Sequence, residues 1–141
     1  MQQDGQDPIQ YLIYASRPVD FEQATLDQIL TTCRKNNAER GITGALICRS
    51  DLYLQLLEGP AEEIDRTYAA IEQDARHTDP KRLAQGTAPQ RLFARWAMRD
   101  APLKSWMWTR EEVASGAVEN LSAEEALEVF INHAKEVNKR R

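Results

Sequence analysis

A single carboxamide inside an apolar run is the first feature of this sequence that indicates chemistry. Gln55 lies in the middle of residues 51–60, a strand-like run that ends at Gly59-Pro60. Alternation places it on one face with Tyr53 and Leu57, and both faces are otherwise apolar, which predicts a central strand covered on both sides. A buried amide with unpaired donors and acceptor costs about 1–3 kcal/mol. The sequence therefore predicts a polar partner for Gln55, which is a neighbouring side chain, a water or a bound ligand.

Polar residues at the ends of other elements are further candidates. Tyr14 is the last large residue of a strand predicted at residues 9–15, and as a core tyrosine it would need only a carbonyl for its hydroxyl. Asn36 and Asn37 end the first predicted helix, although one asparagine suffices to stop a helix. Gly44, inside the next predicted strand, indicates a bulge or a close approach by backbone or ligand.

The overall composition favours a globular domain and argues against several classes of partner. The chain has 141 residues, of which 42% are hydrophobic and 28% charged, and its net charge is -4. The one block of like charge is Lys139-Arg140-Arg141, which we interpret as a solvated terminus, so nucleic acid is not expected to bind directly. No apolar run approaches the length of a membrane span, and no secretory signal precedes the first strand. We therefore expect a cytoplasmic protein without membrane contact.

Cysteine and histidine do not form a recognisable site in the sequence. Cys33 and Cys48 lack metal-ligand spacing, and we interpret both as small buried hydrophobes. His77 and His133 stand equally far apart. No glycine-rich phosphate loop or nucleophile motif is present, so we predict neither a metal site nor an enzyme.

The elements that must position these residues alternate in the order of a ferredoxin-like fold. Apolar residues at helical spacing predict a helix that begins at Asp20 and one that begins after Pro60. We predict five strands, at residues 9–15, 42–49, 51–59, 83–87 and 92–99, and in the last of these Trp96 and Met98 would share a face. The order βαββαββ predicts an α+β ferredoxin-like sandwich with both helices on one face of a mixed sheet.

Two helices near the C-terminus are expected to cover the other face of that sheet. Thr109 with Glu112, and Ser122 with Glu125, have the spacing of capping boxes. They predict a short helix over residues 109–117 and a longer one after Ser122. The buried stripe of the longer helix is predicted to comprise Leu127, Phe130, Ile131, Ala134 and Val137.

Taken together, the motifs resemble those of the BLUF family, the blue-light sensors that use FAD. Their order and spacing match over residues 9–99. The matching pieces are Leu12-Ile13-Tyr14-Ala15-Ser16, Asn36-Asn37, Gly41-Ile42-Thr43-Gly44, Leu54-Gln55-Leu56-Leu57-Glu58-Gly59, Asp74-Ala75-Arg76-His77 and Phe93-Ala94-Arg95-Trp96-Ala97-Met98.

The resemblance implies photochemical roles for two residues and relay roles for two others. Tyr14 would give an electron and a proton to the excited flavin, and the hydrogen bonds of Gln55 would rearrange on illumination. Trp96 and Met98 would relay that change. FAD is the implied cofactor, and FMN or riboflavin is expected to substitute in vitro. The residues implied to bind it are Tyr14, Ile29, Asn36, Asn37, Gln55, Ile71, Asp74, Arg76 and His77.

Within that set the resemblance implies different roles for the isoleucines and the asparagines. Ile29 and Ile71 would sandwich the flavin ring, and Asn37, with Asn36 beside it, would hold the ring's polar edge. One position departs from the family pattern, because Ala70 stands where some relatives carry a basic or imidazole side chain near the flavin.

The resemblance also implies how the chain is organised. Residues 8–100 would form the flavin-binding domain, and residues 101–141 a helical extension packed on the sheet. Nothing after residue 100 resembles an effector domain, so we expect a short stand-alone member that signals to a separate downstream protein or changes its own homo-oligomeric state. The apolar residues 103–108 are either sheet cover or a partner surface.

Two other functions remain open on the same fold. An acylphosphatase-like enzyme would need an arginine-bearing, glycine-rich phosphate loop after the first strand, which Ser16-Arg17-Pro18 does not provide. A flavin-free interaction domain is the second alternative. The intact set of Tyr14, Asn37 and Gln55 argues against it.

Overall fold

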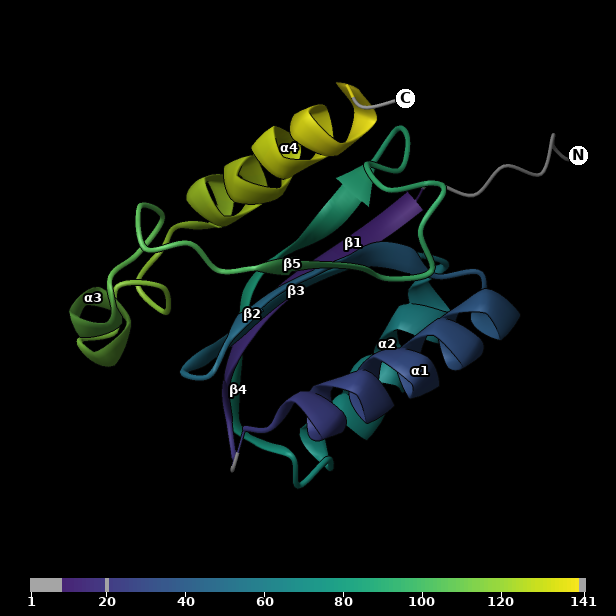
Figure 1. The fold of residues 1–141 in the computed structure, drawn as a ribbon. Helices are drawn as coiled ribbons and strands as arrows, with labels where there is room; N and C mark the ends of the chain where they lie inside the picture. The colour runs from purple at the N-terminus through teal and green to yellow at the C-terminus, as the bar shows by residue number, and fades with distance from the viewer. Residues whose placement is uncertain (1–8, 20, 140–141) are drawn as a thin grey trace, which may run out of the picture.

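Five strands form one mixed sheet with helices on both of its faces (Figure 1). The computed structural model describes residues 9–19 and 21–139. The strands lie in the order β4-β1-β3-β2-β5, and β5 runs parallel to β2 while the other neighbours are antiparallel. The elements are β1 (Ile9–Pro18), α1 (Gln23–Arg40), β2 (Thr43–Arg49), β3 (Leu52–Gly59), α2 (Ala61–Glu72), β4 (His77–Ala88), β5 (Arg99–Pro102), α3 (Arg110–Ala114) and α4 (Ala123–Lys139).

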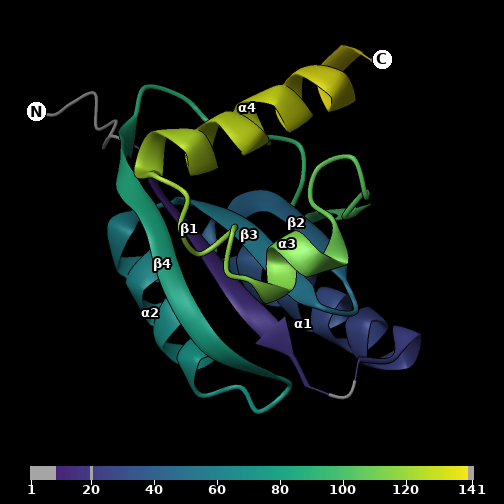
Figure 2. The ribbon, with the colours of Figure 1, turned by 90° about the vertical axis from the view of Figure 1, so that its left-hand side faces the viewer.

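The layers agree with the ferredoxin-like prediction. Helices α1 and α2 cover one face of the sheet, and α4 crosses the other (Figures 1 and 2). The predicted α+β class and the order of elements are confirmed. No helix in the described ranges is both long enough and apolar enough to cross a membrane.

Strand β3 lies at the centre of the sheet and separates two apolar cores. All eight of its residues are buried, as the sequence predicted for a covered strand. Tyr53 and Leu57 belong to the core under α1 and α2, whereas Leu52, Leu54 and Leu56 belong to the core under α4. The predicted alternation of β3 is therefore confirmed.

The hairpin of β2 and β3 is built around the close approach that Gly44 predicted. A Cβ atom at this position would collide with the carbonyl oxygen of Leu56 on the paired strand. Only glycine therefore allows β2 to approach β3 this closely.

Helix α1 is longer at its C-terminus than the sequence suggested. The helix continues through Asn36 and Asn37 to Arg40, so the prediction that the asparagines end it is wrong. Gly41 ends it in the left-handed conformation (φ 71), which glycine adopts without a Cβ penalty. At the other end the helix starts at Gln23, and the predicted cap Asp20 lies outside the described residues.

The prediction of a strand at residues 92–99 is wrong. The chain from 91 to 98, called here the 91–98 segment, consists of turns and bends, and β5 begins only at Arg99. Trp96 and Met98 do not share a face. Trp96 packs on the core under α4, while Met98 is buried in the core under α1 and α2. Strand β4, in turn, is longer than the predicted residues 83–87.

The helices near the C-terminus follow the predicted caps. Thr109 and Glu112 form a complete capping box at α3, which ends at Ala114, three residues before the predicted end. The backbone N–H of Ser122 donates to Glu125, and the N–H of Glu125 donates to the Ser122 hydroxyl. From α4, Ala126, Phe130 and Ala134 are buried in the core, Leu127, Val129 and Val137 are partly buried against it, and Ile131 is half-buried.

Candidate functional site

The register of two central strands brings Tyr14 and Gln55 together. The residues are direct partners in the antiparallel pairing of β1 with β3, so their side chains leave the sheet on the same face. The Tyr14 hydroxyl donates a hydrogen bond to Oε1 of Gln55. The Gln55 Nε2 group donates to the sulfur of Met98 at 3.3 Å. The polar partners predicted for Gln55 therefore include a tyrosine and a methionine of the protein itself.

Tyr14 is held as a neutral phenol. Its side chain is buried, and desolvation, followed by the nearby Cys33 and Tyr68, raises its pKa well above the ordinary value. The Tyr14 ring also meets the Tyr68 ring edge-on at a centroid distance of 5.4 Å. The hydroxyl therefore keeps its proton and remains a donor to Gln55.

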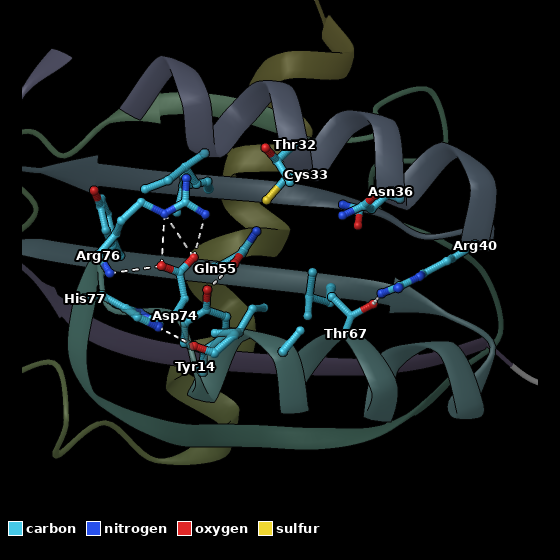
Figure 3. A pocket seen from close by; sticks show the side chains of 17 residues that line it. Tyr14, Thr32, Cys33, Asn36, Arg40, Gln55, Thr67, Asp74, Arg76 and His77 are labelled. Atoms are coloured by element: carbon cyan, nitrogen blue, oxygen red, sulfur yellow. Dashed lines mark hydrogen bonds and ion pairs between the residues drawn. The ribbon is translucent and has the colours of Figure 1, made fainter. Parts of the chain in front are cut away.

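This pair lies at the floor of a pocket of about 320 Å³ between α1, α2 and the sheet (Figure 3). Pockets for small ligands begin at about this size. All nine residues that the sequence resemblance implied for cofactor binding line it: Tyr14, Ile29, Asn36, Asn37, Gln55, Ile71, Asp74, Arg76 and His77.

One end of the pocket carries a fixed ion pair. The Arg76 guanidinium binds the Asp74 carboxylate through two nitrogens, at 2.9 Å and 2.6 Å. These hydrogen bonds are the main reason that the pKa of Asp74 is lowered and that of Arg76 raised. Beside the pair, the ring nitrogens of His77 contact the Ser16 hydroxyl at 2.7 Å and the Ile71 carbonyl oxygen at 2.6 Å.

The opposite end carries amides and a second arginine. Figure 3 shows Asn36, Arg40 and Thr67 away from Asp74, Arg76 and His77. Arg40 donates to the Thr67 hydroxyl at 3.0 Å. Asn37 is almost fully buried and its Nδ2 donates to the carbonyl of Ala97 at 2.8 Å, which leaves its carboxamide oxygen as an acceptor.

Sequence reasoning missed several residues of this pocket. Arg40 follows Ile29, Cys33 and Asn36 at helical spacing, and all four line the pocket. Gly41 is the residue from which Arg40 could have been predicted. Glycine typically ends a helix, and a helix that continues as far as Gly41 includes Arg40. The other unpredicted lining residues are Thr32, Cys33, Leu46, Tyr53, Leu57 and Thr67. Ala70, which the resemblance implied to lie near the flavin, lines the pocket as well.

Glu58 is a further buried polar residue whose role the sequence did not reveal. It is 2% exposed and lies on β3, three residues after Gln55. Its carboxylate accepts hydrogen bonds from the backbone N–H groups of Leu92 at 2.8 Å and Phe93 at 2.7 Å, and from the Thr43 hydroxyl at 3.0 Å. Glu58 therefore fastens the start of the 91–98 segment to the sheet.

The end of the 91–98 segment is held by hydrogen bonds from two residues that line the pocket. Met98 accepts from Gln55, and the carbonyl of Ala97 accepts from Asn37. Trp96 does not line the pocket, because it lies on the other side of the sheet, where the Arg99 guanidinium stacks over its ring at 4.7 Å. The segment therefore links the pocket to the core under α4.

A flat heteroaromatic ring suits this arrangement. Ile29 from α1 and Ile71 from α2 supply apolar walls on two facing helices, while Asn37 and Gln55 supply amides that match a carbonyl-and-imide edge. Within the described residues, no group of three His, Cys, Asp or Glu side chains could hold a metal ion, and Cys33 and Cys48 are free thiols.

Comparison with known proteins identifies a family. A family model described as sensors of blue light using FAD matches residues 9–99, more than half of the chain. A photoactivated adenylate cyclase subunit beta of Euglena gracilis is 33% identical over 92 residues, which are 64% of this chain and 10% of that protein. A blue light- and temperature-regulated antirepressor of Escherichia coli is 34% identical over 88 residues, which are 62% of this chain and 22% of that protein. The chain thus matches only a small part of these relatives.

Solved structures agree with the sequence comparison. The dark state of the BLUF protein BlrB superimposes with a TM-score of 0.76 at 27% identity, over 92% of this chain and 98% of that one. The photo-activated state of BlsA gives a TM-score of 0.74 at 27% identity, over 89% and 94%.

Proposed function

The chain belongs to the BLUF family of blue-light sensors that use FAD, and from this membership we propose that the pocket between α1 and α2 holds the flavin. Ile29 and Ile71 would bind the two faces of the flavin ring, and the carboxamide oxygen of Asn37 would accept from its imide edge. Asn36 lies at the same end of the pocket as Arg40, and Asp74, Arg76 and His77 lie at the other end. The fit of these apolar walls and amides to a planar ring supports the proposal.

Tyr14 is the proposed electron and proton donor. A bound FAD would supply the absorption of blue light and an excited state that accepts electrons. The Tyr14 phenol is neutral and buried, so losing an electron alone would leave an unsolvated charge. We therefore propose that its proton leaves with the electron, first toward Oε1 of Gln55, which already accepts its hydrogen bond.

Gln55 is the proposed switch. Its oxygen now faces Tyr14 and its nitrogen faces Met98. If the amide turns or tautomerises, donor and acceptor exchange places without any change of charge. The contact with the Met98 sulfur would then change, and with it the hydrogen bonds offered to the flavin. The Tyr14–Gln55–Met98 chain of hydrogen bonds is the observation that carries this proposal.

The relay would run through the 91–98 segment. Glu58 holds its start and the pocket holds its end, so a change at Met98 acts on a segment whose other end is fixed. Trp96 would pass the change to the core under α4, and Arg99, directly after Met98, would pass it to β5. A small shift signals only if it biases an element with two arrangements, and we propose that residues 99–137 contain that element.

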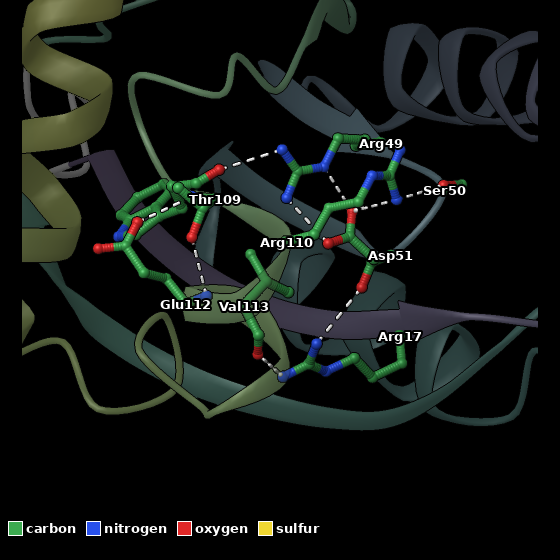
Figure 4. A network of polar contacts seen from close by, with 9 residues as sticks. Arg17, Arg49, Ser50, Asp51, Thr109, Arg110, Glu112 and Val113 are labelled. Carbon is green, nitrogen blue, oxygen red and sulfur yellow. Dashed lines mark hydrogen bonds and ion pairs between the residues drawn. The ribbon is translucent and has the colours of Figure 1, made fainter.

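The C-terminal region is held to the sheet by two arginines, Arg49 at the end of β2 and Arg17 near the end of β1 (Figure 4). Arg49 binds the Asp51 carboxylate at 2.6 Å and donates to the carbonyl of Trp108 at 3.0 Å. Arg17 donates to the carbonyl of Val113 at 2.8 Å. These contacts support treating residues 101–141 as an extension packed on the flavin-binding domain of residues 8–100.

For the output we propose a change in association. Light would alter the chain's own homo-oligomeric state or its affinity for a separate downstream protein, in the cytoplasm, without enzymatic activity of its own. The relatives support a link to effectors, since their names include an adenylate cyclase subunit and an antirepressor. Trp106, 77% exposed within residues 103–108, supports a partner surface there, whereas Leu103 is buried as sheet cover.

An absorption spectrum tests this function directly. The protein purified with FAD should show a flavin band that blue light shifts reversibly to the red. Tyr14→Phe should keep the band and lose the shift. Tyr11→Phe, on the opposite face of the same strand, should keep both. A chain that binds no flavin on reconstitution would refute the proposal.

A further inference from the structure

A second pocket, of about 550 Å³, lies on the face of the sheet away from the flavin pocket. It is formed by β5, the following residues 103–108 and α4. Val129 and Val137 of α4 line it together with Trp106 and Trp108. Its volume is that of a small-ligand site, and its walls are largely apolar, as such sites usually are.

Two side chains that line this pocket each carry a buried nitrogen without a hydrogen-bond partner among the described residues. Arg99 of β5 and His133 of α4 both line it. The Nε of Arg99 and the Nε2 of His133 are buried without a hydrogen-bond partner among the described residues. A buried unpaired donor costs about 1–3 kcal/mol, so each such group requires an explanation.

Arg99 is the principal charge in the pocket. Among the contacts of the described residues it makes no hydrogen bond or ion pair, and its guanidinium is held by stacking over Trp96 at 4.7 Å. The exposed Lys104 adds a second cation, and among the described residues Glu136 is the one acidic residue that lines the pocket. The net charge of the lining is therefore positive by about one unit when the imidazole is neutral.

His133 favours its neutral form. Burial of the ring and then the nearby Arg99 lower its pKa, and Phe93 packs against the ring at a centroid distance of 5.6 Å. A neutral imidazole has one N–H, which Nε2 can carry. The side chain then offers one N–H donor without adding a second full charge.

We propose that this second pocket binds a carboxylate carried on an apolar or aromatic body, with Arg99 and His133 as its donors. The planar guanidinium matches a carboxylate through two parallel hydrogen bonds. A lining with about one net positive charge suits a monoanion better than a dianionic phosphate. The same chemistry is offered by a free small organic acid and by an acidic side chain between apolar residues of a protein segment.

NMR of the tryptophan side chains tests the proposal in the FAD-loaded full chain kept in the dark. The three tryptophans of the sequence are Trp96, Trp106 and Trp108, so every indole N–H signal reports on this region. The probes are phenylacetate, its uncharged analogue phenylacetamide, and the blocked peptide acetyl-Leu-Glu-Phe-amide. Binding is read from the shifts of the indole signals.

We expect phenylacetate or the peptide to shift these signals saturably, and phenylacetamide to do so far more weakly. R99Q should weaken binding by about tenfold or more, the size of one lost charge-assisted hydrogen bond. The matched variant R95Q changes an exposed arginine of the 91–98 segment that does not line the pocket, and it should bind as wild type does. An unchanged flavin band shows that each variant is folded.

Each outcome of this experiment either assigns the site or overturns the proposal. Tighter binding of the peptide assigns the site to a protein segment, and tighter binding of phenylacetate assigns it to a free acid. Binding of neither probe, equal binding of phenylacetamide, or undiminished binding by R99Q would overturn the proposal. Because the measurement needs no illumination, its failure is distinguishable from failure of the proposed photochemistry.

Discussion

The side-chain amide of Gln55 donates to the sulfur of Met98 across 3.3 Å, and this contact connects β3 to the residue that immediately precedes β5. Both side chains are buried, with exposures of 2% each. A sulfur atom is a weak acceptor, so a turned Gln55 amide loses little at this contact. The pair is therefore well suited to change its arrangement while the rest of β3 stays in place.

Replacing Met98 should separate the photochemistry from its output. Met98→Leu preserves volume, so it should cost less than about 1.5 kcal/mol of stability, yet it removes the sulfur acceptor. We expect the light-induced flavin shift to remain. The light-minus-dark difference in hydrogen exchange of β5 and α4 should shrink. Met107→Leu makes the same chemical change away from Gln55 and should leave that difference intact; equal differences in both variants would contradict the relay.

Asn37→Ala should weaken both flavin binding and the fold. The Asn37 side chain is 1% exposed and donates to the carbonyl of Ala97 at 2.8 Å, so its removal leaves that partly buried acceptor unpaired. We expect a loss of about 1–3 kcal/mol in the free energy of unfolding without flavin, and a lower FAD affinity as well. Asn36→Ala, for which no such bond is present in the described residues, should affect only FAD retention. Unchanged unfolding of Asn37→Ala would refute its structural role.

Glu58→Ala should destabilise the protein strongly. The substitution leaves the N–H groups of Leu92 and Phe93 and the hydroxyl of Thr43 without their acceptor. Phe93 is buried and the other two residues are partly buried, so at about 1–3 kcal/mol per buried group urea unfolding should show a loss of about 2 kcal/mol or more. Glu128→Ala, an exposed position of α4, should stay within about 0.5 kcal/mol of wild type. A small effect at Glu58 would mean that the 91–98 segment is held by other contacts.

The prediction of residues 92–99 as a strand shows what a sequence pattern cannot distinguish. Leu92, Ala94, Trp96 and Met98 alternate with other residues as in a strand, but Ala94 is exposed, and Trp96 and Met98 pack into two different cores. The N–H groups at the start of the segment are satisfied by Glu58 rather than by a neighbouring strand. When a side chain accepts the hydrogen bonds that a neighbouring strand would otherwise accept, the sequence shows no periodic pattern that reveals it.

Other parts of the fold and the pocket could be predicted from the sequence because each depends on a local pattern of residues. The covered strand around Gln55, the apolar stripes of α1 and α2 and the capping boxes depend on spacing alone. Asn36 and Asn37 were identified as candidates even though the helix end was misplaced. Arg40 and Thr67, by contrast, meet across two helices, and no local pattern indicates such a contact.

The ion pair of Asp74 and Arg76 should make stability depend on acid pH. The arginine lowers the Asp74 pKa in the folded state below the ordinary 3.8, so the pair stabilises the fold above that pH, and the contribution is lost as pH falls through the folded value. The difference in unfolding free energy between wild type and Asp74→Asn should be constant from pH 7 to about pH 5 and shrink below pH 3.8. Arg76→Gln should behave alike; a difference that stays constant down to pH 2 would contradict the pairing.

The light-minus-dark absorption spectrum of Gln55→Leu tests the central claim most directly. Leucine keeps the volume and apolar packing of the site but can neither accept from Tyr14 nor exchange donor for acceptor. We expect the variant to bind FAD, to show a normal flavin band in the dark, and to give no red shift under blue light that shifts the wild type. A red shift of normal size and recovery in Gln55→Leu would contradict the assignment of Gln55 as the switch.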